Sequence, residues 1–158
     1  MAEIRDIWLH AHHMIRSARQ IINENLRSLN LSSAEGNILL HLLTQEQEMG
    51  QEQLVEQLDI SKPAVSRALN SLVAKGYATW LPDPQDRRAH RVRLTEQAQK
   101  IGPDIERAYN QIYALAMRGI SQKELDDFVK LFGRISENFR CAQAKKITEE
   151  NYAAQRLG

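Results

Sequence analysis

The chain of 158 residues is long enough for one domain, or for one domain and an interface module. Hydrophobic residues make up 42% of it and charged residues 26%, which is ordinary for a soluble globular protein. No apolar run approaches the roughly 18 residues of a membrane span, and the first residues lack the pattern of a signal peptide. A single cysteine, Cys141, excludes an internal disulfide and a cysteine-only metal cluster. We therefore expect a cytoplasmic protein with no membrane partner.

The first predicted element is a long amphipathic helix from Ile4 to Leu29, in which apolar residues recur every three or four positions. Its apolar stripe is wider than one short partner could cover, so we expect burial against more than one element. Three histidines lie in its first half: His10, His12 and His13. Their spacing spreads them around the helix, which favours exposed or packed histidines over a metal site.

A second helix is predicted to begin at a capping box formed by Ser32 and Glu35. Its apolar face consists of Ile38, Leu39, Leu42 and Leu43. His41 lies beside this face, where the simplest interpretation is a packed side chain. The helix ends in the polar stretch from Gln45 to Met49.

The next two elements have the pattern of a helix-turn-helix. A short helix from Gln51 to Leu58 ends at a tight break, and a longer helix then runs to Lys75. Ser61 is a good N-cap for the longer helix. Gly76 follows Lys75 as the residue that ends it.

The longer helix has two different sides. Its apolar side should pack on the preceding helix and on the body of the domain, and consists of Val65, Ala68, Leu69, Leu72 and Val73. The opposite side carries Lys62, Pro63, Ser66, Arg67, Asn70 and Ser71. Short donors and acceptors with one arginine form a surface that can enter a major groove. An ordinary solvated helix face is the alternative interpretation.

After Gly76 the pattern changes to that of a β-hairpin. The two strand-like segments are Tyr77–Leu81 and Arg91–Leu94, with proline and aspartate residues at the tip between them. From residue 87 to residue 93, four arginines and His90 occur without an acidic residue, a charge density that phosphates would neutralise. From Ser61 to Thr95, seven basic and two acidic residues give a net charge of +5, although the whole chain carries only +1. Positive charge is therefore concentrated on the segment that contains the longer helix and the hairpin.

The segment SKPAVSRALNSLVAKGY, followed by DPQDRRAHRVRLT, resembles the MarR family of bacterial transcriptional regulators. The wing of that family carries an Asp-x-Arg pattern and then a strand that ends in Leu-Thr, which correspond here to Asp86, Arg88, Leu94 and Thr95. The resemblance extends from the first helix to about residue 140. It implies a winged helix-turn-helix in which Arg88 enters a minor groove and Asp86 orients it. The negative potential of a narrow minor groove agrees with that role.

The helix face and the wing together define the expected contacts to double-stranded DNA. These are Ser61, Lys62, Pro63, Ser66, Arg67, Asn70, Ser71, Asp86, Arg87, Arg88, His90 and Arg91.

Two helices are predicted beyond the wing. Thr95 can cap the first, in which Gly102 and Pro103 predict a kink or a weak first turn. Ser121 and Glu124 form a capping box for the second. Their heptad-like stripes hold more apolar surface than a small winged helix can cover, so a two-fold dimer is favoured over a monomeric bundle. The expected dimerisation residues are Ile4, Trp8, Ile15, Leu125, Phe128, Phe132, Ile135 and Phe139.

The expected fold class is mainly α with a small β-hairpin wing. Residues 31–95 form the winged helix-turn-helix, and residues 1–30 and 96–147 form a helical dimerisation module. Residues 148–158 form a tail that either extends the last helix or is disordered.

The resemblance implies a homodimeric repressor that a small aromatic or anionic ligand releases from a pseudo-palindromic operator. Candidate effector-binding residues are His12, Arg16 and His41, polar residues beside apolar stripes. A metal-responsive or activating regulator of the same fold is the alternative, and a third possibility is an interaction module that has lost DNA binding. No glycine-rich phosphate loop, His-Glu-x-x-His or nucleophile motif occurs. We therefore expect no enzymatic activity, no cofactor and no metal site.

Overall fold

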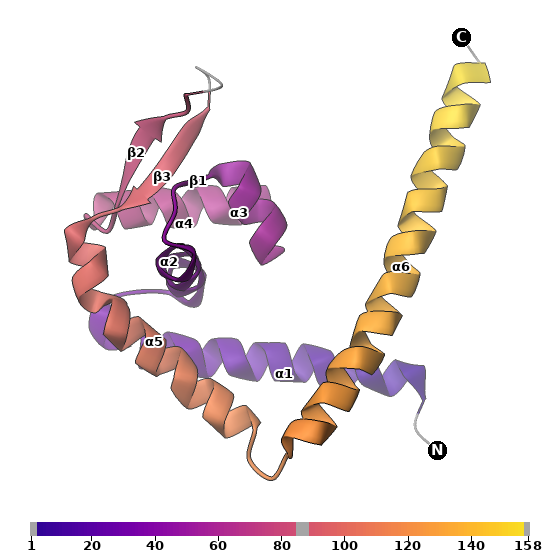
Figure 1. Ribbon diagram of the computed structural model, residues 1–158, viewed down its shortest axis with the longest axis horizontal. Coiled ribbons are helices and arrows are strands. Elements are labelled where there is room, and N and C mark those ends of the chain that lie inside the picture. The colour runs from indigo at the N-terminus through magenta and orange to yellow at the C-terminus, as the bar shows by residue number, and fades with distance from the viewer. Residues whose placement is uncertain (1–2, 85–88, 157–158) are drawn as a thin grey trace. The chain divides into compact units, whose positions relative to one another are not determined.

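The computed structural model describes the backbone of residues 3–84 and 89–156 and the side chains up to residue 142 within them. The elements are α1 (Ile4–Asn25), η1 (Arg27–Leu29), α2 (Ser33–Gln45), β1 (Met49–Gly50), α3 (Gln51–Leu58), α4 (Lys62–Ala74), β2 (Ala78–Pro82), β3 (His90–Leu94), α5 (Glu96–Ala116) and α6 (Gln122–Arg156) (Figure 1). They form two compact units, Met1–Ala116 and Met117–Gly158. The predicted fold class, mainly α with a β-hairpin wing, is confirmed. Within the described residues, no helix is sufficiently long and apolar to cross a membrane.

The core of the first unit lies where α2, α3, α4 and the hairpin meet. The predicted apolar stripe of α4 is buried, with Val65, Leu69 and Leu72 fully inaccessible to solvent. It packs in one cluster with Ile38 and Leu39 of α2. Because apolar residues on both helices repeat with the helical period, each helix presents one continuous apolar face to the other. Burial of that face leaves the polar side of α4 at the surface.

Helix ends follow the local signals in the sequence. The capping box at α2 forms as predicted, with the Ser32 backbone N–H donating to Glu35 Oε2 at 2.7 Å. Gly76 ends α4 with a left-handed φ of 78°. The Tyr77 N–H donates to the Leu72 carbonyl, and the Gly76 N–H donates to the carbonyl of the next residue along α4, as in a Schellman motif. Ser61 is the N-cap residue of α4, but its side chain makes no capping hydrogen bond.

The helices beyond the wing also begin as predicted. The Ala98 N–H donates to Thr95 Oγ1 at the start of α5, and Ser121 and Glu124 form reciprocal bonds at the start of α6. α5 continues as one helix through Pro103. α6 extends to Arg156, so its backbone passes the predicted boundary at residue 147.

The sheet has three antiparallel strands in the order β1-β3-β2. Val92 of β3 lies between Met49 of β1 and Trp80 of β2. The hairpin was predicted, but β1 was missed, because the sequence from Gln45 to Met49 was interpreted as a polar end to the preceding helix. A strand of two residues is too short to show the alternation that identifies strands.

The first helix ends earlier than predicted. α1 stops at Asn25, and a 3₁₀ turn, η1, replaces the last predicted helical turn. Leu26 and Leu31 are both buried on either side of this turn, and the Leu31 N–H donates to the Leu26 carbonyl. In a continuous α-helix, residues five positions apart lie roughly 140° apart around the axis and cannot both face one core, so the chain turns between them. Asn30 accomplishes the reversal with a left-handed φ of 54°, a conformation that asparagine tolerates well.

α2 and α5 are close at Gly36. A Cβ atom built at Gly36 would lie 2.3 Å from Leu26 Cδ1 and 3.0 Å from the Tyr109 hydroxyl oxygen. Tyr109 is buried, and its hydroxyl donates to Asn37 Oδ1 at 2.5 Å. Burial raises the pKa of Tyr109, so its hydroxyl stays protonated and remains a donor. The glycine therefore permits the contact that joins the winged helix to α5.

We expect Gly36→Ala to lower the free energy of unfolding by about 1–3 kcal/mol, because a methyl group there overlaps packed side chains. Urea denaturation measures the change. The matched control is Gly102→Ala in α5, where an added Cβ would lie 3.4 Å from Leu43 Cδ2, an ordinary contact. Alanine is the better helix former, so the control should be neutral or slightly stabilised. Equal losses in both variants would contradict the packing at Gly36.

Candidate nucleic-acid interface

The polar side of α4 is accessible along the whole helix. Lys62, Pro63, Arg67 and Asn70 are exposed, as is the preceding Ser61, whereas Ser66 and Ser71 are half-buried. Pro63 at the start of the helix, where a missing N–H is tolerated, leaves this end compact. The structure therefore brings the seven helix residues predicted to contact DNA onto one accessible surface, with the two serines at its edge.

Ser71 is held from within the protein. Its side chain hydrogen-bonds to the carboxylate of Glu35, a buried residue of α2. Lys75 Nζ donates to the same carboxylate at 2.6 Å. Burial alone would raise the pKa of Glu35, but the hydrogen bonds from Lys75, Ser32 and Ser71 outweigh it and hold the pKa below its ordinary value. The sequence indicates Glu35 only as part of the capping box, because its partner Lys75 lies 40 positions further along the chain.

The N-terminal end of α4 carries a looser ion pair. Lys62 Nζ lies 3.0 Å from Glu52 Oε1 at the start of α3, and both side chains are more than half exposed. Such exposed pairs contribute little to stability, because water screens them and holding two long side chains costs entropy. Lys62 therefore remains free to exchange its carboxylate partner for a phosphate.

The hairpin is less strongly basic in the structure than in the sequence. Arg91 Nε lies 3.2 Å from Asp83 Oδ2, and Arg93 Nε lies 2.6 Å from Glu48 Oε1. Because no acidic residue lies within this run of the sequence, partners for these arginines were not predicted. The fold supplies them from the preceding strand end and from the segment before β1. Three predicted contacts, Asp86, Arg87 and Arg88, lie outside the described residues.

A groove of about 730 Å³ separates the start of α3 from the hairpin. Lys62 and Arg91 lie in its lining together with their carboxylate partners, Glu52 and Asp83. Trp80 and His90 also line it, with their rings in an edge-to-face arrangement at a centroid distance of 6.3 Å. Trp80 was not predicted as a functional residue. Its position opposite β3 could only be recognised once the strand register was known.

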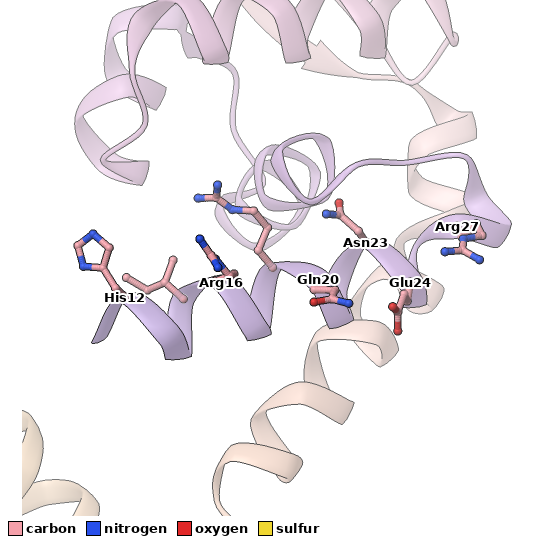
Figure 2. Close-up of a pocket in the computed structure, with 8 residues that line it drawn as sticks. His12, Arg16, Gln20, Asn23, Glu24 and Arg27 are labelled. Carbon is pink, nitrogen blue, oxygen red and sulfur yellow. The ribbon is translucent and has the colours of Figure 1, made fainter. Parts of the chain in front are cut away.

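A second hollow, of about 560 Å³, lies along α1 (Figure 2). It is lined by His12, Ile15, Arg16, Arg19, Gln20, Asn23, Glu24 and Arg27. Figure 2 shows His12 and Arg16 on the same side of the helix, as expected for residues four positions apart. Two of the three candidate effector residues therefore share one hollow. His41 is not in its lining, and instead contacts Gln57 of α3 through Nε2 at 2.7 Å.

Large apolar side chains are exposed on α1 and α6, and α5 also exposes Tyr113 and Leu115. On α1 they include Ile4, Trp8 and Ile15, all predicted for dimerisation. On α6 they include Phe128, Phe132 and Phe139, while Leu125 and Ile135 are half-buried. Phe128 and Phe132 stack on each other with centroids 5.6 Å apart. Contiguous exposed apolar faces of this kind mark surfaces that bind another protein.

No group of three histidine, cysteine, aspartate or glutamate residues is arranged to hold a metal ion among the residues with described positions. The three histidines near the start of α1 are exposed, and His12 Nδ1 lies 3.2 Å from the Trp8 carbonyl.

Comparison with known proteins agrees with this architecture. The model of the MarR family matches residues 29–89. A MarR transcriptional regulator from Methanosarcina mazei Go1 is 24% identical, with a TM-score of 0.74 over 85% of this chain and 96% of that chain. The transcriptional regulator SlyA is 21% identical, with a TM-score of 0.77 over 85% and 94%. A Listeria monocytogenes chain assigned to the MarR family, solved in complex with a 26mer DNA, is 27% identical, with a TM-score of 0.74 over 87% and 89%.

A helix-turn-helix with an accessible second helix, followed by a β-hairpin wing, is the architecture of winged-helix DNA-binding domains. The family resemblance predicted from the sequence is confirmed, since the model of the MarR family matches the winged-helix segment of this chain.

The Glu35 carboxylate predicts how stability responds to acid. Its pKa in the folded protein lies below the ordinary value of 4.5. Its contribution is therefore complete above pH 4.5 and is lost as pH falls through the folded-state pKa. We expect Glu35→Gln to lose less stability than the wild type on acidification, as measured by urea denaturation at several pH values. Glu106→Gln, which removes an exposed carboxylate from α5, should keep the wild-type response. Identical acid responses in wild type and Glu35→Gln would contradict the assignment.

Proposed function

We propose that this protein is a homodimeric, sequence-specific repressor that binds double-stranded DNA at a pseudo-palindromic operator and leaves it when a small aromatic or anionic ligand binds. The observation that carries this proposal is the accessible polar side of α4 beside the hairpin wing. In the proposed dimer, residues 31–95 bind DNA, while residues 1–30 and 96–147 hold the two protomers together.

Side-chain chemistry indicates which residues would contact bases and which would contact the DNA backbone. Arg67 and Asn70 lie in the middle of the exposed face of α4, and both can form bidentate bonds to base edges in a major groove. Ser61, Lys62, Pro63, Ser66 and Ser71 surround them and position the helix on the backbone. The wing residues His90 and Arg91, with Arg87, contact phosphates. Arg88 enters the flanking minor groove, with Asp86 as its orienting partner.

The apolar faces of α1 and α6 support a dimer. Fully burying one Phe or Ile side chain contributes roughly 1.5–3 kcal/mol, so several such residues left in water would strongly favour association. A two-fold contact covers the same face on both protomers. It also relates two copies of α4, which would then enter successive major grooves about 34 Å apart.

The hollow on α1 supports an anionic effector. Arg16, Arg19 and Arg27 line it with Glu24 as the single acidic residue, and Ile15 adds an apolar contact. All its lining residues lie on α1 and η1, so the hollow has one wall, and the dimer would supply the rest. A ligand acts only if its affinity differs between the DNA-binding and the released conformations. We propose that His12 and Arg16 contact the ligand first. His41 of α2 is the third proposed effector-binding residue.

An activator would use the same surfaces. The position of the operator relative to a promoter decides between repression and activation, and that position is a property of the DNA. Measuring transcription from a promoter that carries the bound sequence separates the two.

Selection of bound sequences from a random duplex pool at near-physiological salt tests the proposal. We expect enrichment of an inverted repeat whose half-sites are centred about one helical turn apart. A folded dimer that enriches no sequence would overturn the proposal of sequence-specific repression.

Arg67→Ala should weaken binding to the selected operator by about 1–3 kcal/mol and relax base preference within the half-site. Arg88→Ala should instead weaken binding most at sites with a narrow flanking minor groove. Fluorescence anisotropy with operator variants measures both effects. Equal losses on the operator and on random DNA in both variants would contradict these roles.

Phe132→Asp on α6 should convert the dimer to a monomer at micromolar concentration, because burying a carboxylate without a partner costs several kcal/mol. Sedimentation velocity measures the change. The control is Lys130→Asp, which places the same carboxylate two residues away, on the opposite side of the helix. A wild type that sediments as a monomer, or a Phe132→Asp variant that remains dimeric, would argue against α6 as the interface.

A further inference from the structure

Lys75 occupies a junction between the end of α4 and the turn that follows α1. It is the C-cap residue of α4. Its ammonium group donates to Glu35 Oε1 at 2.6 Å and to the Asn30 backbone carbonyl at 2.7 Å. The side chain is only 26% exposed. Two of its three donors are therefore directed inward, at acceptors that belong to α2 and to the η1 turn.

Glu35 fixes the other side of this junction. Among the residues whose side chains are described, it is the only charged one that is buried, with 4% of its surface exposed. Its second carboxylate oxygen, Oε2, accepts the Ser32 backbone N–H at 2.7 Å, so the carboxylate cannot rotate freely. Ser71, one turn before Lys75 on α4, also hydrogen-bonds to it. Two side chains of α4 are thus tied to one carboxylate of α2.

The two ends of α4 differ in how firmly they are held. At the N-terminal end, Lys62 pairs with Glu52, and both side chains are largely in water. At the C-terminal end, the Lys75 pair is largely shielded from water. Electrostatic interactions strengthen as the local dielectric constant falls, so the C-terminal pair is the more rigid link. It lies at the end of the helix whose exposed face would read DNA.

The Asn30 carbonyl connects this link to α1. Asn30 caps η1, and its left-handed backbone directs the chain from η1 into α2. Arg27, the first residue of η1, lines the hollow on α1. The residue that lines the hollow and the residue whose carbonyl accepts from Lys75 are therefore only three positions apart in the chain.

We propose that Lys75 is a positioning residue: with Glu35, it locks the C-terminal end of the recognition helix to the η1 turn, and thereby sets the sequence preference of DNA binding. The inference rests on the proposed function, because it assumes that α4 reads DNA. Lys75 itself contacts no base or phosphate in this proposal. It acts through the orientation of Arg67, Asn70 and Ser71.

The test compares binding to the selected operator and to a scrambled duplex of the same length, at one salt concentration. Lys75→Met alone leaves the Glu35 carboxylate buried without its cation and should be destabilised. The informative variant is therefore Glu35→Gln with Lys75→Met, which removes both charges together. We expect its preference for the operator over the scrambled duplex to fall about tenfold, the size of a typical coupling between contacting residues. Binding to the scrambled duplex and its salt dependence should stay at wild-type values.

Two further variants complete the set. Lys75→Arg keeps a cation that can donate to both acceptors, and should retain most of the preference. Lys100→Met removes an exposed lysine from α5 and changes the net charge by the same amount as Lys75→Met. It should leave the preference at the wild-type value. Thermal denaturation of each variant identifies the temperature at which all are folded, and binding is measured there.

Hydrogen exchange gives a second readout, the amide protection that operator binding adds. If the Lys75–Glu35 pair were purely structural, removing it would leave this added protection unchanged. Operator binding to the wild type should protect the amides of Asn30 and Leu31, whose hydrogen bonds hold η1. In the double variant that protection should be lost, while protection of α4 itself remains.

Three results would overturn the proposal in different ways. Equal losses on operator and scrambled duplex, with a salt slope smaller by about one, would make Lys75 a phosphate contact. An unchanged preference in the folded double variant would make the pair merely structural. A wild type that binds all duplexes alike would overturn the proposed function, and the role of Lys75 with it.

Discussion

The structure depends on the burial of one side of α4. Val65, Leu69 and Leu72 are fully removed from water against α2, which contributes roughly 1.5–3 kcal/mol for each side chain. Because a helix is rigid, fixing its apolar side also fixes where its polar side points. Arg67 and Asn70 are therefore presented to solvent as a consequence of core packing. The same packing places Glu35 beneath the helix, where its carboxylate needs the partners that α4 supplies.

The electrostatics of the interface are more balanced than its sequence indicates. Arg91, Arg93 and Lys62 each have a carboxylate partner within the winged helix. In the proposed function these pairs hold the cations in place before DNA binds, and the exposed Lys62–Glu52 pair is the least costly to break. Charge neutralised in this way reduces indiscriminate binding to any polyanion, whereas sequence preference depends on the orientation of α4. Affinity and specificity therefore have separate structural origins in the proposed function.

The winged helix presents a different kind of surface from the helices α1 and α6. The winged helix covers its apolar residues within its own core, with Gly36 and Tyr109 joining α2 to α5. α1 and α6 leave large apolar side chains exposed, and the proposed dimer would cover them. The hollow on α1 lies on one of these helices, so the proposed effector site and the proposed dimer contact share an element. Ligand binding could then alter the spacing of the two reading helices without touching either of them.

Most of the helices and their caps, the hairpin and the polar side of α4 could be predicted from the sequence, because these depend on periodicity and on signals within a few residues of each other. Ser32 with Glu35, Gly76 and Ser121 with Glu124 behave as local chemistry requires. Which charged side chains pair with each other depends on the three-dimensional fold. Glu35 and Lys75 are separated by 40 positions, and Arg93 and Glu48 by 45. The short strand β1 and the early end of α1 likewise arise from contacts with distant residues, Val92 and the shared core, whose energy no local pattern contains.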